Sequence, residues 1–148
     1  MQITLTNRQR RVRLDLVPLR ALASAALLEC VRQSGDGLFA LARMPLVEVA
    51  VISDPAIARV HRRFMDIPGA TDVITFGHGE IVVSADTAAR CAAERGHSPV
   101  EELALYIVHG LLHLNGFDDR DSAARRRMHR VQDRIWRKIR ERAGAGGR

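Results

Sequence analysis

The sequence is poor in cysteine and in aromatic residues. Its two cysteines, Cys30 and Cys91, lie far apart and lack the CxxC spacing of a zinc or redox pair. We therefore expect two free thiols in a reducing compartment rather than a disulfide. Aromatic residues make up 4% of the chain. So few rings give little support for base-specific reading of RNA, which depends on stacking.

Long apolar runs are also missing. No run reaches the roughly 20 residues that cross a bilayer, and the longest is interrupted by His109. The start, MQITLTNRQRRVRLD, lacks the apolar stretch and small-residue cleavage site of a secretory signal. We therefore expect a cytoplasmic protein that does not use a membrane. At 148 residues and 47% hydrophobic, the chain fits one globular domain.

The positive charge is concentrated at one end of the chain. Residues 120–148 carry eleven basic residues and three acidic ones, whereas residues 1–119 carry twelve and fourteen. A basic segment on a near-neutral body suits a polyanionic partner such as nucleic acid. A solvated helix face explains the pattern equally well, because every basic residue except Lys138 is an arginine.

Four short segments have the pattern of β-strands. The first two alternate apolar and polar residues, and the last two flank Gly77-His78-Gly79, which is typical of a hairpin turn. These segments are residues 3–7, 45–53, 71–76 and 79–84.

Five further segments have the pattern of helices. The pairs Asp54-Pro55 and Ser98-Pro99 each place a capping residue before a proline at the first helical position. The expected helices are residues 16–35, 54–64, 85–96, 98–115 and 122–142. The element order predicts an α+β fold, in which about four strands form a small mixed sheet packed with about five helices. We expect a single domain over residues 1–142 and a disordered tail over residues 143–148.

The stretch HGLLHLNGFDDRD, residues 109–121, has the pattern of a metal site. His109 and His113 are four residues apart, so both rings project from one face of a helix. Gly116 ends the helix and can turn Asp118 or Asp119 back toward the rings. Two imidazoles and a carboxylate leave a coordination position open for water, which is typical of catalytic rather than structural sites. We therefore expect a metal site at the C-terminal end of this helix.

Two other interpretations of this stretch remain open. Histidines can simply favour the negative end of a helix dipole, and aspartates after a glycine form ordinary turns. However, an apolar helix seldom carries two polar rings on one face unless something satisfies them. A metallopeptidase of the HExxH type is the lesser hypothesis, because Gly110 stands where its glutamate base belongs.

The motif HGLLHLNGFDD resembles the signature of the YbeY family, H-G-x-L-H-L-x-G-[FY]-D-H. TDVITF at 71–76, GEIVVS at 79–84 and the ITLTN start are similar to family blocks in order and spacing. The resemblance implies a metal-dependent endoribonuclease that cuts single-stranded RNA. It further implies a role in maturation and quality control of small-subunit ribosomal RNA, with the small ribosomal subunit as partner.

The resemblance also implies a zinc ion held by three histidines. His109 and His113 match the first two ligands, and Asp119 stands where the family has the third; Asp118 is the alternate third ligand. An aspartate can bind Zn²⁺ but lowers the local charge, and this ligand set also suits Fe²⁺, Mn²⁺ or Ni²⁺. No small-molecule cofactor is expected.

A second departure lies just before TDVITF. Met65 stands where the family commonly has an arginine that matters for RNA cleavage. Arg62 and Arg63 are nearby on the expected helix and are our candidates for phosphate contacts, although both could be ordinary solvated arginines. Because of Met65 and Asp119, the alternative function is a ribosome- or RNA-associated factor with weak or no nuclease activity.

Overall fold

The computed structural model describes residues 1–146 and contains the mixed four-stranded sheet that the sequence predicts. The strands lie in the order β1-β2-β4-β3, with β1, β2 and β4 parallel and β3 antiparallel to β4. Because β3 is an edge strand, one of its sides is open for contact. The strands are β1 (Gln2–Asn7), β2 (Leu46–Ile52), β3 (Val73–Phe76) and β4 (Glu80–Ser84).

Five α-helices complete the predicted α+β fold. A short 3-10 helix at Leu41–Arg43, which the sequence pattern did not indicate, precedes β2. Side chains of Asp15, Ser53, Ser84 and Ser98 cap the first four helices. The cap at Ser98 is as expected, whereas the cap of α2 is Ser53 and not the expected Asp54, which is the first residue of that helix. The helices are α1 (Leu16–Val31), α2 (Asp54–Met65), α3 (Ala85–Arg95), α4 (Pro99–Leu114) and α5 (Ser122–Gly146).

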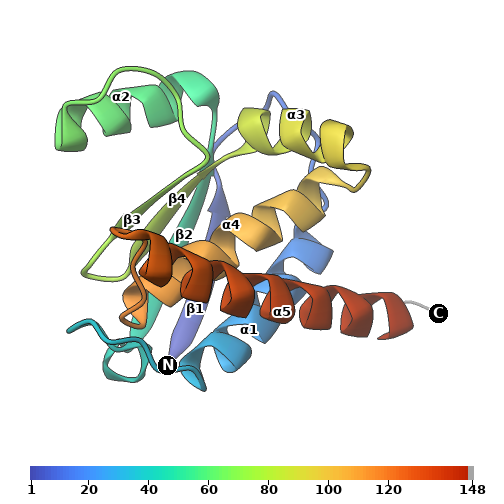
Figure 1. Ribbon diagram of the computed structural model, residues 1–148. Coiled ribbons are helices and arrows are strands. Elements are labelled where there is room, and N and C mark those ends of the chain that lie inside the picture. The colour runs from blue at the N-terminus through green and yellow to red at the C-terminus, as the bar shows by residue number, and fades with distance from the viewer. Residues whose placement is uncertain (147–148) are drawn as a thin grey trace.

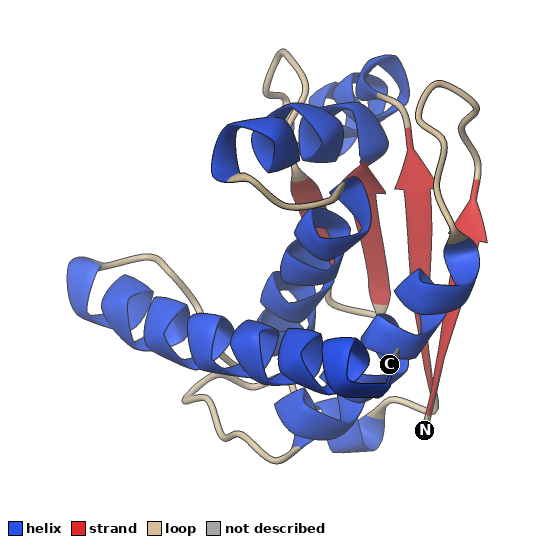
Figure 2. Ribbon diagram, turned by 90° about the vertical axis from the view of Figure 1, so that its right-hand side faces the viewer, coloured by secondary structure: helices blue, strands red, loops and turns tan. Residues whose placement is uncertain are grey.

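The inner face of the sheet carries the main hydrophobic core. Helix α4 lies against this face and also contacts α1, α3 and α5, so eleven of its residues are buried. Helix α5 crosses the outside of the molecule over α1 and α4 (Figures 1 and 2). Helix α4 is therefore held on nearly every side, which suits an element that carries a functional group.

The outer face of the sheet is covered much more thinly. Helix α2 packs there over the smaller hydrophobic cluster that contains Ile52, Ile57, Ile74 and Val82. At the start of α2, the Asp54 carboxylate accepts hydrogen bonds from Ser84 and Thr87 at the start of α3. These bonds fix the start of α2 to the carboxyl ends of the parallel strands (Figure 1), and near its far end the Phe64 ring packs against Phe76 of β3.

Two expected helix ends differ from the structure by four residues each. Helix α1 ends at Val31, four residues before Gly35, because residues 33–37 leave the helix to pack on the end of α4. Helix α5 continues to Gly146, four residues beyond its expected end at residue 142, and residues 147–148 lie outside the described residues. Ion pairs of Lys138 and Arg142 with Glu29 on α1 anchor the last turns of α5. Within residues 1–146, no helix is both long and apolar enough to span a membrane.

Candidate metal centre

The end of α4 brings the predicted histidines together. The Nε2 atoms of His109 and His113 lie 3.1 Å apart, and both side chains are partly buried. Gly116, with φ of +89°, then reverses the chain in the left-handed conformation that favours glycine. A carboxylate oxygen of Asp119 lies with the two imidazole nitrogens in a group whose ligand atoms are all within 4.8 Å of one another.

The hydrogen bonds made by Nδ1 of the two rings show whether each Nε2 atom carries a proton or a free lone pair. Nδ1 of His113 donates to the backbone oxygen of Phe117 at 3.0 Å, and a carbonyl can only accept. Nδ1 of His109 lies 2.7 Å from the side-chain oxygen Oε1 of Gln132 on α5, and donates to it. Both neutral rings therefore present Nε2 lone pairs to the same point, an arrangement that repels itself unless a cation lies between them.

The two candidate aspartates have different surroundings. Asp118 accepts hydrogen bonds from the backbone and guanidinium of Arg120, at 3.2 and 3.1 Å. These bonds hold the pKa of Asp118 below its usual value, and its carboxylate lies outside the group that could hold a metal. The Asp119 carboxylate forms no ion pair with any described residue. Asp119 is thus the acid that the fold offers to the histidines.

Asn115 fixes the turn that carries these aspartates. Its side-chain amide donates to the backbone oxygens of Cys30 and Gln33, at 2.9 and 2.6 Å. Its side-chain oxygen accepts from the backbone nitrogen of Leu41 at 3.0 Å. One buried residue therefore joins the end of α4, the end of α1 and the segment before β2, all of which border the site.

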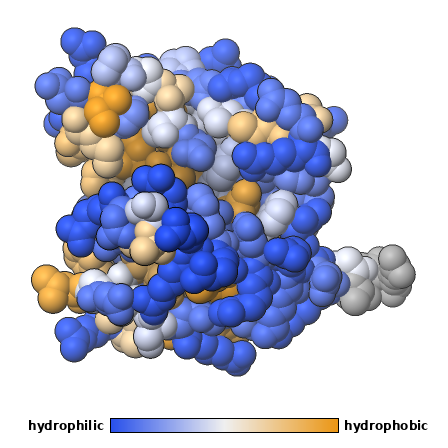
Figure 3. Space-filling model, in the orientation of Figure 1, coloured by the Kyte–Doolittle hydropathy of each residue, from blue (hydrophilic) through white to orange (hydrophobic). Residues whose placement is uncertain are grey.

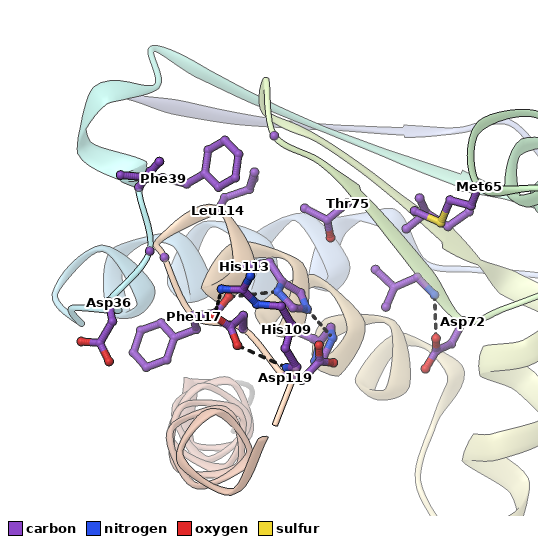
Figure 4. Close-up of a pocket in the computed structure, with 18 residues that line it drawn as sticks. Asp36, Phe39, Met65, Asp72, Thr75, His109, His113, Leu114, Phe117 and Asp119 are labelled. Carbon is purple, nitrogen blue, oxygen red and sulfur yellow. Dashed lines mark hydrogen bonds and ion pairs between the residues drawn. The ribbon is translucent and has the colours of Figure 1, made fainter. Parts of the chain in front are cut away.

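The metal-binding group lies in a cavity of about 790 Å³. Figure 4 shows the two histidines at its centre with Asp119 beside them, Phe39 toward one end, and Met65 and Asp72 toward the other. Val73 and Thr75 line it from the inner side of β3. The cavity is large enough to hold a nucleotide in addition to a metal ion.

The cavity is acidic apart from one arginine. Its lining includes Asp36, Asp72, Asp118, Asp119 and a single basic residue, Arg120. Asp36 pairs with Arg127 of α5, and Asp118 pairs with Arg120, so neither of these cations is available to a ligand. A polyanion could approach this cavity only if a cation offset its negative charge.

Burial is the main influence on His109. It lowers the pKa of His109 below the ordinary 6.5, while the hydrogen bond to Gln132 and the charges of Asp119 and Asp72 act in the opposite direction. A ring that loses its proton readily keeps its lone pair available to a metal. The electrostatics of the site therefore agree with its geometry.

The structure does not bring Arg62 and Arg63 to the metal-binding group. Both are exposed on α2, and neither lines the cavity. The guanidinium of Arg63 instead lies 5.4 Å from the centre of the Phe64 ring. Met65, which stands where an arginine was expected, does line the cavity. The cavity therefore lacks the phosphate contact that the sequence suggested.

Gln132 and Arg120 are the residues that sequence reasoning missed. Gln132 lies 23 positions after His109, and only the packing of α5 on α4 brings the two together. No sequence spacing signals such a contact. Arg120 stood next to the motif, but its pairing with Asp118 was not foreseen.

Known proteins are similar to this chain in sequence. The family model described as Endoribonuclease YbeY matches residues 4–140. The endoribonuclease YbeY of Acidothermus cellulolyticus is 33% identical over 130 residues, which cover 70% of this chain and 79% of that protein. The protein of the same name from Mycobacterium tuberculosis is 35% identical, over 66% of this chain and 68% of that protein. The one from Micrococcus luteus is also 35% identical, over 59% of this chain and 66% of that protein.

One solved structure shares the fold. The solution structure of TM1509 from Thermotoga maritima superposes with a TM-score of 0.66 at 19% identity, covering 98% of this chain and 93% of that one. The family model spans nearly all of the chain, and the motif residues that suggested the resemblance lie within it. The prediction from sequence is confirmed: this chain belongs to the YbeY endoribonuclease family.

Proposed function

We propose that the protein is a metal-dependent endoribonuclease that cuts single-stranded RNA during maturation and quality control of small-subunit ribosomal RNA. Family membership supports a nuclease. The observation that carries the metal dependence is the convergence of two Nε2 lone pairs and the Asp119 carboxylate in one cavity. Because the substrate is ribosomal RNA, we expect the protein to act in the cytoplasm, at the small ribosomal subunit.

His109, His113 and Asp119 would hold the ion, with Asp118 as the weaker candidate for the third position. Two imidazoles and a carboxylate suit Zn²⁺, our first choice, and also Fe²⁺, Mn²⁺ or Ni²⁺. Such an ion lowers the pKa of water and polarises a phosphate. Held by these residues, it would also offset the negative charge of the acids that line the cavity, Asp36, Asp72, Asp118 and Asp119.

The remaining residues position these groups and shape the cavity. Gln132 and the Phe117 carbonyl fix the two rings so that Nε2 faces the ion. Leu114, Phe117 and Val73 give the cavity part of its apolar lining. The sugar-phosphate chain would lie along the cavity, between Met65 toward one end and Phe39 toward the other (Figure 4).

Part of α5 is suited to hold RNA phosphates near the site. Arg127, Arg134, Lys138, Arg140 and Arg142 anchor this helix to the body of the protein. Four other arginines on its exposed side make no ion pair within residues 1–146. These are Arg125, Arg126, Arg130 and Arg137. The surface over α5 is hydrophilic (Figure 3), so these side chains can contact a backbone without sequence preference.

The proposal is tested by metal analysis followed by RNA cleavage. Purified protein should contain one divalent ion per chain by mass spectrometry, and it should cut a labelled single-stranded RNA. A chelator should abolish cleavage, and added Zn²⁺, Fe²⁺, Mn²⁺ or Ni²⁺ in separate reactions should show which ion restores it. Cleavage that survives complete metal removal would contradict the proposed mechanism.

A second function is favoured by the acidic cavity and by Met65. A site without an available arginine suits an RNA- or ribosome-associated factor with weak or no nuclease activity. Such a factor would bind RNA in the test above and carry the metal, but would leave the RNA intact. A peptidase is less well supported, because Gly110 is buried against Ile81, with no room for the glutamate base.

A further inference from the structure

The outer face of the sheet carries a second cavity, which we call the outer groove. It has a volume of about 730 Å³ and lies between α2 and the exposed surface of β2, β4 and β3. Ile52 and Val82 form part of its floor. Among residues 1–146, α2 is the helix that packs on this face, and no second helix closes the groove.

The charge of the outer groove is positive and unbalanced. Arg8, Arg59 and Arg63 line it, and none of the three forms an ion pair in the part of the chain that the structure describes. Arg59 and Arg63 are four residues apart, so they point from the same side of α2. Glu80 is the acid that lines the groove, and its Oε2 atom lies 3.9 Å from Nε2 of His78. Three arginines without an acidic partner among residues 1–146 favour a polyanionic ligand.

The same groove gathers aromatic rings in a chain that has few. Phe64 and Phe76 lie edge to face with centres 5.3 Å apart, and Phe76 and His78 are stacked at 5.9 Å. Phe64 is 61% exposed, although it is a large hydrophobic residue. Exposed rings beside arginines are the elements that hold single-stranded nucleic acid, since bases stack on rings while arginines hold phosphates.

The outer groove adjoins the metal cavity along the edge of the sheet. Phe64 lines the groove and the next residue, Met65, lines the metal cavity. Along β3, Thr75 lines the metal cavity and Phe76 the groove, since successive side chains of a strand face opposite sides. A single-stranded RNA that leaves the metal cavity past Met65 would therefore cross the open edge of β3 and enter the outer groove.

We propose that the outer groove binds single-stranded RNA that flanks the scissile phosphate, with phosphates on Arg8, Arg59 and Arg63 and bases against Phe64 and His78. This inference rests on the proposed function for its choice of RNA as the ligand. The sequence suggested that Arg63 contacts a phosphate in the metal cavity. In this proposal Arg63 contacts a phosphate in the outer groove instead.

Binding is measured by fluorescence anisotropy with a labelled single-stranded RNA, in chelator, so that cleavage does not interfere. The double variant Arg59→Glu/Arg63→Glu should bind at least about tenfold more weakly and lose about two from the slope of log affinity against log salt. Arg20→Glu is the matched control: Arg20 is also an exposed helix arginine without an ion pair in residues 1–146, but it lies on α1. It should change affinity by less than about twofold.

Phe64→Leu tests the stacking separately from the charge. Leucine keeps an apolar side chain on α2 but removes the ring, so affinity for single-stranded RNA should fall about fivefold while affinity for a duplex of equal length stays the same. An equal change for both RNAs, or none for either, would overturn the assignment of bases to this ring.

The design separates this inference from the proposed function. If the wild type does not cleave RNA but the double variant still weakens binding and its salt dependence, the groove inference stands and the nuclease proposal fails. If the wild type cleaves RNA while the double variant binds RNA as the wild type does, the nuclease proposal stands. The outer groove would then serve a ligand other than RNA, and the inference would be wrong.

Discussion

The two halves of the candidate metal centre are built in different ways. The imidazoles of His109 and His113 stand on a helix that is packed on nearly all sides, and each has a hydrogen bond that sets its orientation. Asp119 stands on the turn between α4 and α5, where its carboxylate has no partner among the described residues.

We call His109 and His113 the rigid half of the site and Asp119 its adjustable half. Ligands fixed before the metal arrives lose little conformational entropy on binding and therefore determine affinity. A ligand on a loop can move by the small distance needed to fit an imidazole or a carboxylate. Asp119, which stands where the family resemblance implied a third histidine, falls on the adjustable half.

Loss of a ligand from the rigid half should have the largest effect. His113→Ala leaves one imidazole, which cannot hold the ion with Asp119 alone, so bound metal and RNA cleavage should both fall to background. His129→Ala is the matched control, because His129 is exposed on α5 and should leave both unchanged. Metal content by mass spectrometry and cleavage of labelled RNA check the result. Full activity in His113→Ala would refute a role for the metal.

Loosening the rigid half without removing a ligand should have a smaller effect. Gln132→Leu removes the acceptor that orients His109, and we expect metal affinity to fall about 10–100-fold. Gln132→Glu keeps an acceptor oxygen and should retain most of the affinity. Competition with a chromogenic chelator measures both constants. Equal affinities for the leucine and glutamate variants would show that Gln132 does not position the ring.

A change in the adjustable half should be milder still. Asp119→His restores three neutral ligands, so the ion keeps its full charge, and kcat should rise about threefold to tenfold if metal content is unchanged. Asp118→Ala should leave metal content intact, because Asp118 pairs with Arg120 rather than with the histidines. If Asp118→Ala lost the ion and Asp119→Ala kept it, Asp118 rather than Asp119 would be the third ligand.

The smallest effect concerns the proton on His109. Burial lowers the pKa of this ring below 6.5, and Gln132→Leu should lower the pKa further, because the hydrogen bond to Gln132 raises it. The folded metal-free protein then binds this proton more weakly than the unfolded chain. Its free energy of unfolding should therefore decrease as the pH falls below 6.5, until the ring is protonated in both states. Proton NMR titration of the imidazole and denaturant unfolding at several pH values measure the two effects.

The sequence predicted the rigid half of the site better than its surroundings. Four-residue spacing on a helix with clear start and stop signals is a local property, and it placed His109 and His113 correctly on one face. Gln132 and the outer groove depend on how distant segments pack, and local patterns carry no information about that packing. The low aromatic content suggested that stacking surfaces were scarce, yet Phe64, Phe76 and His78 meet in one place.

Glycine also misled the prediction of helix ends. The pattern predicts that the first helix stops at Gly35, but that helix ends at Val31. The pattern predicts the end of the last helix at residue 142, whereas α5, anchored to Glu29 through Lys138 and Arg142, continues to Gly146. In both places the local preference of a residue was outweighed by packing between segments far apart in the chain.

Gly35 has no functional side chain, but it lies directly against the backbone of Gly116. We therefore expect a substitution at Gly35 to be as damaging as the loss of a metal ligand. A methyl group at Gly35 would lie within about 2.5 Å of the Gly116 carbonyl oxygen and the Phe117 nitrogen, where only backbone atoms could yield. The Phe117 carbonyl orients His113, so the displacement would pass directly to the imidazole. A screen for inactive variants should therefore recover Gly35→Ala, a mutation in a surface loop that removes no functional group.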